Sequence, residues 1–597
     1  NASGWGLTPD AKTVLHFDDV RLVGAKKTVL LSDFEQEEQP FSGLTRSTDV
    51  AKSGTTAGRW ANMTANRSVS CWDIPHDWTD FDQLEFWLHA EEATGARVVL
   101  ILDSDAPKAS AKAEKLVKKE FSFRFSNRDW PITFEDKIDW HANPTEGVNR
   151  THLWNESLNR HFHFRDLSSA YWQSGDDRYA AAVAEHVLDW VKRNPMPLMS
   201  SGNRTAMTNC TWQTLTTGIR MEAIWPDALY RCLGSPAFTD EVVVTMIKSC
   251  ADQADHLVKN PTGGNWLTEE SMGVYTVGML FPEFRKAKEW RRIAIERLNR
   301  QLDEDVYPDG MEVELAAGYS NWVIANLTYL LERAESVGLR DEIPDDFLTR
   351  LERAYDYHLY AMMPNGRIPG LNDSGPANVR GHLGKAYGLF PKREDFLFGS
   401  TLGAQGTQPS KLSVAFPYSG HFVMRSGWDA DAVYALLDSG PFGYGHQHED
   451  KLTLVLYAHG RSLLLDPGNF SYDRSPARHY VLGTHGHNTI MVDGEGQKRR
   501  GYRDTYVWPK PWDTPTPAGD DTLWQTTPEA DFVRGSYTDG YGPGAAIRVE
   551  HTRRMVYAKP DYFIVLDTLE PDDDKEHSYT SLFHIDDTEA TLDETTL

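Results

Sequence analysis

The stretch Tyr179-Ala-Ala-Ala-Val-Ala-Glu-His-Val-Leu-Asp-Trp-Val191 decides the fold class of the central part of the chain. Its apolar residues recur at intervals of three and four, which places them on one face of a helix. These residues are Tyr179, Val183, Val187, Trp190 and Val191. An amphipathic helix is therefore expected here.

The helical period continues from about residue 150 to about residue 395. A second clear example is Trp290, Ala294, Leu298 and Leu302. Further helical stretches are expected at 239–259, 320–337 and 346–363. Gly338 and the turn Pro364-Asn-Gly end two of them, so successive helices should be antiparallel neighbours. A run of such hairpins closes into an α/α toroid, which we assign to residues 150–400. The lack of a strict repeat argues against an extended solenoid.

Period-two alternation, which is typical of strands, flanks the helical region on both sides. Before it, alternating segments predict a small β-sandwich in residues 1–110, for which carbohydrate binding is one interpretation. The segments are Thr28-Val-Leu-Leu-Ser, Leu84-Glu-Phe-Trp-Leu and Arg97-Val-Val-Leu-Ile-Leu. Residues 111–149 are expected to be a connector. After about residue 410, repeated alternation predicts a large antiparallel β-sandwich in residues 401–597. The chain is thus predicted to be a multidomain α+β protein.

Composition excludes several classes of protein. The 597 residues carry a formal net charge of -26, and the mean hydropathy is -0.52. Nucleic acid and anionic membranes are not expected partners, because phosphate binding needs a clustered basic face. No apolar run is long enough to predict a membrane span. An acidic polysaccharide remains compatible, since a local cleft can be basic on an acidic protein. The four cysteines lack the CxxC spacing of a thiolate zinc site.

The densest group of titratable residues lies in the second region of strands. It comprises Gly445-His-Gln-His-Glu-Asp, Leu465-Asp-Pro-Gly and Gly486-His-Asn-Thr. On a strand, His446 and His448 would project to the same face, and Asp466 and His487 would approach from neighbouring strands. Two imidazoles and one carboxylate suit zinc, with a fourth position left for water or substrate. The alternative is that these histidines form hydrogen bonds within turns.

A second group of polar residues lies in the helical region. It comprises Gly263-Gly-Asn-Trp-Leu-Thr-Glu, Phe281-Pro-Glu-Phe, Pro308-Asp-Gly-Met-Glu-Val-Glu and Gly318-Tyr-Ser-Asn-Trp. The glycines beside Asn265 and Tyr319 suggest loops between helices, where catalytic groups are often mounted. Tyr319 is alternatively a packing residue, and Glu312 and Glu314 are alternatively a solvated edge.

These segments, in consistent order, resemble the heparinase II/III and oligoalginate lyases. In the helical region the resemblance rests on Asn143-Pro, Asn149-Arg-Thr-His-Leu-Trp, Leu158-Asn-Arg-His, Trp212-Gln-Thr-Leu, Gly218-Ile-Arg, Asn265, Phe281-Pro-Glu-Phe, Pro308-Asp-Gly-Met-Glu-Val-Glu and Tyr319. In the following strands it rests on His446-Gln-His-Glu-Asp, Asp466-Pro-Gly and His487-Asn-Thr. The match covers about residues 140 to 500, which makes it more specific than any single motif.

The resemblance implies a catalytic cleft between the toroid and the second sandwich. Tyr319 corresponds to the catalytic tyrosine, His446 to its partner histidine, and Asn265 to the group that neutralises the substrate carboxylate. Arg220 corresponds to an arginine that lines the cleft, and Glu269 to a polar neighbour of Asn265.

The resemblance also implies one structural zinc ion and no organic cofactor. The corresponding zinc ligands are His448, Asp466 and His487, and the ion would order the loop that carries His446. The chain departs from the family at two positions. Trp266 and Ser320 stand where histidines are usual, and the flat ring of Trp266 suits stacking on a sugar face.

The implied function is that of a secreted or periplasmic polysaccharide lyase. Such an enzyme cleaves a uronate-containing acidic polysaccharide by β-elimination and releases unsaturated oligosaccharides. Tyr319 and His446 would share the roles of acid and base. Alginate, ulvan, glucuronan and glycosaminoglycans all present a uronate and are the candidate substrates.

Two other functions compete with the lyase. The first is a glycoside hydrolase on an α/α toroid, with its two carboxylic acids drawn from Glu269, Glu314 and Asp309. The second is a non-catalytic glycan-binding protein, which Trp266 favours. Only the lyase forms a conjugated alkene, so the product separates the three.

Overall fold

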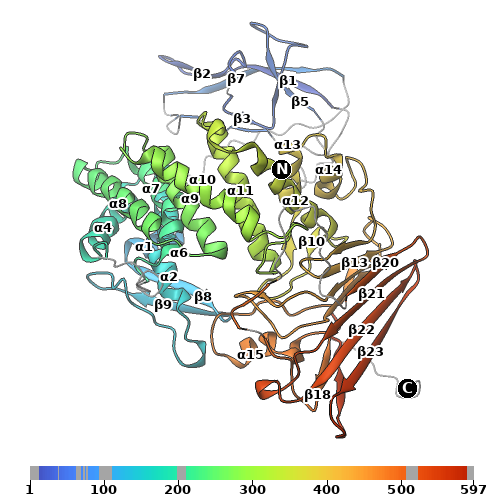
Figure 1. Cartoon of the computed structure of the whole chain (residues 1–597). Coiled ribbons are helices and arrows are strands. Elements are labelled where there is room, and N and C mark those ends of the chain that lie inside the picture. The colour runs from blue at the N-terminus through green and yellow to red at the C-terminus, as the bar shows by residue number, and fades with distance from the viewer. Residues whose placement is uncertain are drawn as a thin grey trace. The chain divides into compact units, whose positions relative to one another are not determined.

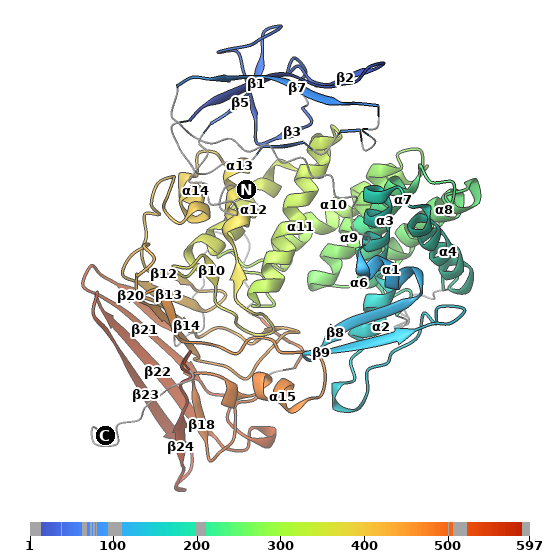
Figure 2. The same cartoon turned by 180° about the vertical axis from the view of Figure 1, so that it is seen from behind.

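The computed structural model describes residues 13–37, 39–61, 69–71, 74–75, 78, 80–92, 110–197, 210–499, 501–505 and 522–587. The chain divides into two compact units, Asn1–Asp105 and Ala106–Leu597. Helices and antiparallel sheets both contribute to the second unit (Figures 1 and 2), which confirms the predicted mixed architecture.

The first unit is built from antiparallel strands. Its main sheet has the order β2-β1-β5-β4, with β7 also paired to β1, and β3 pairs with β6. The bounds are β1 Leu15–Val23, β2 Thr28–Ser32, β3 Phe41–Ser42, β4 Thr45–Ser47, β5 Ala57–Trp60, β6 Ser70–Cys71 and β7 Gln83–Ala90. The strands predicted from Thr28 and from Leu84 are confirmed as β2 and β7. The strand predicted from Arg97 lies outside the described residues.

Most helices of the second unit gather at one end of it, apart from the strands of residues 414–571, whereas the short helix α15 Pro476–Leu482 lies at the strand end (Figure 1). Their bounds are α2 Leu153–Asn159, α3 His163–Ser174, α4 Asp177–Arg193, α6 Thr214–Ile219, α7 Trp225–Cys232, α8 Asp240–Lys259, α9 Gly264–Leu280, α10 Ala287–Glu304, α11 Ala317–Ser336, α12 Asp345–Tyr360, α13 Arg380–Leu389 and α14 Glu394–Thr401. The predicted helices are confirmed as α4, α8, α10, α11 and α12. Within the described ranges, no helix has both the length and the apolar composition needed to cross a bilayer.

Helix α4 forms as its sequence pattern predicts. The side chain of Asp176 accepts a hydrogen bond from the backbone N–H of Arg178 and caps the first turn. Four of the five periodic apolar side chains are fully buried, namely Tyr179, Val183, Val187 and Trp190. Burying each side chain of this size stabilises the fold by about 1.5–3 kcal/mol. The apolar stripe therefore anchors α4 in the core.

Helix α9 is buried along almost its whole length, between α6, α10 and α11. Its crossing with α6 depends on two glycines. A Cβ at Gly218 would lie 2.7 Å from the carbonyl oxygen of Glu269, and a Cβ at Gly273 would lie 2.8 Å from the carbonyl oxygen of Gly218. Only glycine permits so close an approach of the two backbones. The contact therefore fixes the position of α9 relative to α6, and with it the position of the N-terminus of α9.

The stretch 111–149 is more than a link between domains. It contains α1 Ala111–Val117 and the hairpin of β8 Glu120–Phe125 with β9 Arg128–Thr133. Phe121, Trp130 and Trp140 of this stretch are buried in the same core as the helices. The indole N–H of Trp154 in α2 donates to the carbonyl oxygen of Trp130 at 2.9 Å. The hairpin is thus part of the helical body.

Two antiparallel sheets form the other end of the second unit (Figure 2). One has the order β12-β13-β14-β16-β17 and the other β20-β21-β22-β23. The bounds are β12 Val414–Phe416, β13 His421–Arg425, β14 Tyr434–Asp438, β16 Leu454–Ala458, β17 Arg461–Leu464, β20 Leu523–Thr526, β21 Ala530–Tyr537, β22 Val549–Ala558 and β23 Tyr562–Pro571. Phe422 and Leu437 of the first sheet share a buried cluster with Val533 and Met555 of the second. The two sheets therefore pack face against face.

Two pairs of short strands position the segments that carry the titratable residues. β15 Gly443–Tyr444 pairs with β19 Arg503–Asp504, and β18 Ile490–Val492 pairs with β24 Tyr579–Ser581. The strand expected at His446 and His448 is wrong, because β15 ends at Tyr444 and both histidines lie in the loop that follows. Two histidines that are two positions apart on a loop need not share a face, and these two have different neighbours.

Candidate active site

Asn265 lies in the first turn of α9, and Glu314 holds its amide. The backbone N–H of Asn265 donates to Glu314 Oε1 at 3.1 Å, and its side-chain Nδ2 lies 3.0 Å from Oε1 and 2.7 Å from Oε2. Both residues are buried. Gly264 makes the contact possible, since its φ is +59° and a Cβ there would lie 2.7 Å from Glu314 Oε1.

Tyr319 lies in the first turn of α11, five positions after Glu314 in the sequence. Its hydroxyl is 2.6 Å from the hydroxyl of Tyr472, in the loop after β17. Burial raises the pKa of Tyr319 to about 12, although the hydrogen bond with Tyr472 acts in the opposite direction. The phenol is therefore protonated at neutral pH.

His446, in the loop that follows β15, is the third residue of this group. Its ring stacks on the ring of Tyr319, with centroids 3.9 Å apart and an interplanar angle of 19°. Nδ1 of His446 lies 3.0 Å from Glu314 Oε2. The distance suits a hydrogen bond, but the N–H is not aimed at the oxygen in this conformation. Side chains far apart in sequence thus meet around one carboxylate.

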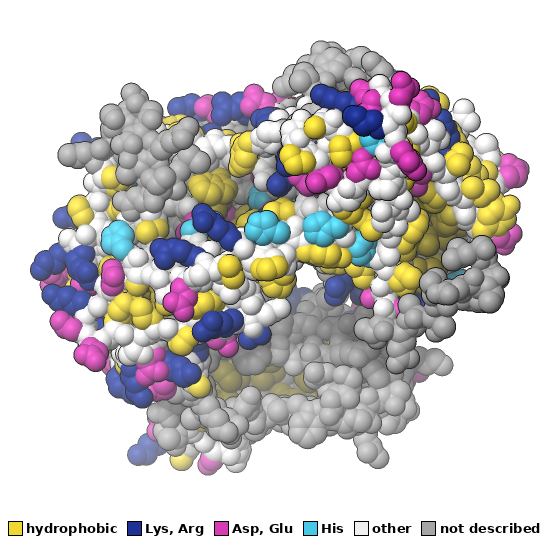
Figure 3. All heavy atoms as spheres, turned by 90° about the horizontal axis from the view of Figure 1, so that it is seen from below, with side chains coloured by type: hydrophobic (Ala, Val, Ile, Leu, Met, Phe, Trp, Pro, Cys, Tyr) yellow, Lys and Arg dark blue, Asp and Glu magenta, His cyan; other side chains and the backbone are white. Residues whose placement is uncertain are grey.

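The structure brings together Asn265, Tyr319 and His446, the three residues expected to be catalytic. Asn265 and Tyr319 occupy the first turns of helices, not the loops between helices that were expected. In the view from below, several histidine side chains reach the surface across the middle of the molecule, with both basic and acidic side chains nearby (Figure 3).

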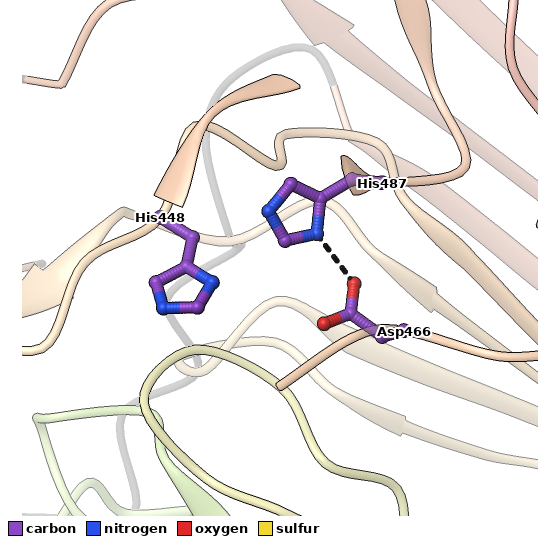
Figure 4. A group of neighbouring side chains, drawn as sticks. All are labelled: His448, Asp466 and His487. Atoms are coloured by element: carbon purple, nitrogen blue, oxygen red, sulfur yellow. Dashed lines mark hydrogen bonds and ion pairs between the residues drawn. The ribbon is translucent and has the colours of Figure 1, made fainter. Parts of the chain in front are cut away.

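His448, Asp466 and His487 form a second group (Figure 4). One potential ligand atom from each lies within 4.8 Å of the others. Among the described residues, Nδ1 of His448 has no hydrogen-bond partner although it is buried, and it points toward the other two side chains (Figure 4). An unpaired buried nitrogen facing an imidazole and a carboxylate fits a metal ion.

The neighbours of this group also suit a metal ion. Nδ1 of His487 is 2.7 Å from Asp466 Oδ2. Burial lowers the pKa of His487, but the charge of Asp466 outweighs it and raises the value to about 9. A bound cation would replace that proton. On the far side of His448, Nε2 is 2.9 Å from Asp373 Oδ1, so a carboxylate fixes the orientation of the ring.

Arg220 does not lie in this site. Its side chain is fully buried, and the guanidinium donates to Gln253 Oε1 at 2.8 Å, to the carbonyl oxygen of Asn159 at 2.7 Å and to Thr217 Oγ1 at 3.0 Å. It also lies over the ring of Trp190 at 4.5 Å. Since the helices enclose it, this guanidinium has no surface for a glycan, and the cleft-lining position expected for it is wrong.

Arg160, at the end of α2, lies closer to the candidate residues. It interacts electrostatically with Tyr319 and with Glu269, and its Nη2 is 3.1 Å from Glu156 Oε2. Glu269 itself is buried, and burial raises its pKa to about 8. Trp266 is half-buried beside Asn265. Arg160 belongs to the segment Leu158-Asn-Arg-His, but its position here was not predicted.

The carboxylates of the competing hydrolase are occupied by other contacts. Asp309 accepts backbone hydrogen bonds from Tyr418 at 2.8 Å and Ser419 at 2.9 Å, so it fixes a turn.

Glu312 and Glu314 are 1% and 3% exposed, so the solvated edge suggested for them is wrong. Tyr472 and the role of Glu314 in the site were also not predicted.

Comparisons with known proteins find the same family along most of the chain. The family model described as "Heparinase II/III N-terminus" matches residues 93–398, and "Heparinase II/III-like, C-terminal" matches residues 408–597. A heparin-sulfate lyase of Bacteroides stercoris is 28% identical over 62% of this chain and 58% of its own length. One of Pedobacter heparinus is 26% identical over 73% of this chain and 61% of its own length. The chain thus spans about three fifths of these relatives.

Solved structures show the same fold. A crystal structure of heparinase III, at 24% identity, covers 80% of this chain and 73% of the solved chain with a TM-score of 0.65. A heparan sulfate lyase from Pedobacter heparinus, also at 24% identity, covers 77% of this chain and 68% of the solved chain with a TM-score of 0.53.

Proposed function

The chain belongs to the heparinase II/III family, and on this basis we propose that it is a polysaccharide lyase that cleaves a uronate-containing acidic glycan by β-elimination. The observation that carries the proposal is the convergence of Asn265, Tyr319 and His446 from three segments around Glu314. The proposed catalytic fold is an α/α toroid that faces a β-sandwich.

The reaction first needs the uronate carboxylate to be neutralised. A proton on the carbon beside a carboxylate is poorly acidic, because the carbanion adds charge next to an existing negative group. Asn265 supplies an N–H donor, which strengthens its hydrogen bond as charge moves onto the carboxylate oxygens. Arg160 supplies positive charge near Tyr319, a role first expected of Arg220.

Tyr319 and His446 divide the two proton transfers. The phenol remains protonated at neutral pH because its pKa is raised to about 12, so it is suited to donate a proton to the leaving glycosidic oxygen. His446 takes the proton from the carbon beside the carboxylate. The electron pair of that C–H bond forms the new double bond as the neighbouring C–O bond breaks. The product is an alkene conjugated with the carboxylate.

His448, Asp466 and His487 would hold one zinc ion. When bound, the ion orders the segments that meet there, including the loop that carries His446 two positions earlier, and it takes no part in the proton transfers. No organic cofactor is part of the proposal.

The substrate class proposed first is a glycosaminoglycan, because the relatives are named heparin-sulfate lyases. Alginate, ulvan and glucuronan also present a uronate. Trp266, half-buried beside Asn265, is suited to stack on a sugar ring in the same cleft. A secreted or periplasmic location agrees with such polymeric substrates.

Ultraviolet absorbance of the conjugated alkene tests the proposal directly. The protein is incubated with heparan sulfate, alginate, ulvan and glucuronan, and absorbance should rise with at least one of them. New reducing ends without absorbance would favour the hydrolase. Binding without either signal across the panel would favour a non-catalytic glycan-binding protein.

A further inference from the structure

Glu314 is the only residue named above that contacts both Asn265 and His446. Both carboxylate oxygens lie within 3.0 Å of Asn265 Nδ2, and Oε2 also lies 3.0 Å from His446 Nδ1. Its side chain is 4% exposed. A carboxylate so deeply buried is costly unless it is well hydrogen-bonded, and here the backbone and side-chain N–H groups of Asn265 donate to it.

The surrounding backbone leaves little room for Glu314 to move. Gly264 faces one carboxylate oxygen, and a Cβ at Gly443 would lie 2.9 Å from the carbonyl oxygen of Glu314. Both glycines have positive φ, +59° and +93°. The backbone N–H of Glu314 donates to Glu312 Oε2 at 3.0 Å. The carboxylate is therefore held between the start of α9 and the loop after β15.

This carboxylate determines how Asn265 presents its amide. A carboxylate only accepts hydrogen bonds, so the nitrogen of the Asn265 amide must face Glu314 and the oxygen must face away. An amide nitrogen has two N–H groups, and one remains for a substrate carboxylate. Without Glu314, the amide could rotate and present its oxygen, which would repel that carboxylate.

The same carboxylate determines the tautomer of His446. With Nδ1 beside Glu314, the favoured neutral tautomer carries its proton on Nδ1 and leaves the lone pair on Nε2. A base needs that lone pair. The N–H is poorly aligned here, and hydrogen bonds of this kind often tighten only when substrate is bound.

We propose that Glu314 is the positioning residue of the active site, which turns the Asn265 amide toward the substrate carboxylate and keeps His446 in the Nδ1–H tautomer. The inference rests on the proposed function, since it assigns Asn265 and His446 their proposed roles. It assigns Glu314 no proton transfer, unlike the hydrolase alternative.

The test compares Glu314→Gln with Glu270→Gln. Glutamine carries no negative charge, and its NH₂ group places a donor where one carboxylate oxygen faced donors, so it holds the Asn265 amide and the Nδ1–H tautomer of His446 less firmly. By analogy with the loss of a tautomer-fixing carboxylate, kcat should fall by at least about 100-fold. Glu270 is an equally buried glutamate whose carboxylate accepts hydrogen bonds from Thr262 and has no part in the contacts of Glu314, and its variant should stay within about threefold of the original kcat. Equal activity of the two variants would overturn the proposal.

A spectroscopic measurement separates positioning from folding. Nitrogen NMR of histidine-labelled protein, at a pH where the ring is neutral, should show His446 protonated at Nδ1, with its signal assigned by loss in His446→Gln. Glu314→Gln should shift the population toward the Nε2–H tautomer, which a merely structural role would not do. An Nε2–H tautomer in the unmodified protein overturns the proposal even if Glu314→Gln does not fold. If the unmodified protein forms no alkene, the proposed function fails, while the tautomer still decides the role of Glu314.

Discussion

The imidazole of His446 lies flat against the phenol of Tyr319, with centroids 3.9 Å apart and planes inclined by 19°. In this stacked geometry neither ring aims a polar atom at the other. The hydroxyl of Tyr319 instead meets that of Tyr472 at 2.6 Å. Each ring thus keeps an acid–base atom for a bound sugar, as a two-residue elimination requires.

Replacing Tyr319 with phenylalanine should remove the proton donor and keep the stacked ring. We expect kcat for alkene formation to fall by about 10²- to 10⁴-fold, with the unfolding temperature almost unchanged. Tyr329→Phe is the matched control, because Tyr329 lies on the same helix and is 40% exposed. Full activity of Tyr319→Phe would remove this residue from the mechanism.

Replacing Gly264 with alanine should damage the site through Glu314. The left-handed φ of +59° disfavours alanine, and its Cβ would lie 2.7 Å from Glu314 Oε1. We expect a loss of about 1–2 kcal/mol in unfolding free energy, together with reduced kcat. Gly263→Ala is the control, since its Cβ would meet only the Tyr444 hydroxyl at 3.5 Å. Denaturant unfolding and initial rates measure both effects, and equal behaviour of the two variants would contradict the argument.

Replacing Arg220 with glutamine should affect stability and not substrate binding. The change removes three hydrogen bonds from a fully buried guanidinium and leaves acceptors without partners. We expect a loss of about 3 kcal/mol in unfolding free energy, with KM unchanged in the folded fraction. Arg160→Gln should instead raise KM, because Arg160 lies near Tyr319. If KM rose in Arg220→Gln and not in Arg160→Gln, Arg220 would have to contact the substrate, which would contradict its buried position.

Replacing Asp373 with asparagine should remove a pH-dependent part of the stability. Burial would raise the pKa of Asp373, but hydrogen bonds from His448 and Arg478 outweigh it and lower the value to about 2. A lowered folded-state pKa stabilises the protein fully above the unfolded value near ~3.9, and this contribution disappears as the pH falls toward ~2. We expect Asp373→Asn to lose about 2.5 kcal/mol at neutral pH and the difference to shrink in acid.

The control for that experiment is Asp136→Asn. Asp136 is exposed, so the substitution should change the unfolding free energy by less than about 0.5 kcal/mol at any pH. Denaturant unfolding across a pH series gives both curves. A constant difference between Asp373→Asn and the unmodified protein down to pH ~2 would show that the lowered pKa is not its origin.

Removing the zinc should loosen the loop that carries His446. Elemental analysis should find about one zinc ion per chain, and a chelator should lower both the unfolding temperature and kcat. His487→Ala should bind no zinc, whereas His485→Gln, two positions away and outside the three-residue group, should retain it. Metal-free protein with full activity and an unchanged unfolding temperature would contradict the proposed zinc site.

The sequence by itself determined the local structure and most members of the site. The spacing from Tyr179 to Val191 predicted α4, because the apolar face of a helix depends on residues only three or four positions apart. The motifs around Asn265, Tyr319 and His446 pointed to one cleft, and these side chains do meet. The three expected zinc ligands also lie together.

Only the tertiary structure decided which side chains are buried and which of them touch. Arg220 lies in a motif with the expected spacing, yet the surrounding helices enclose its guanidinium. Tyr472 meets Tyr319 across 153 positions of sequence, and Glu314 joins Asn265 to His446. Such contacts depend on how whole helices and sheets pack, because close packing fixes positions that no local period encodes.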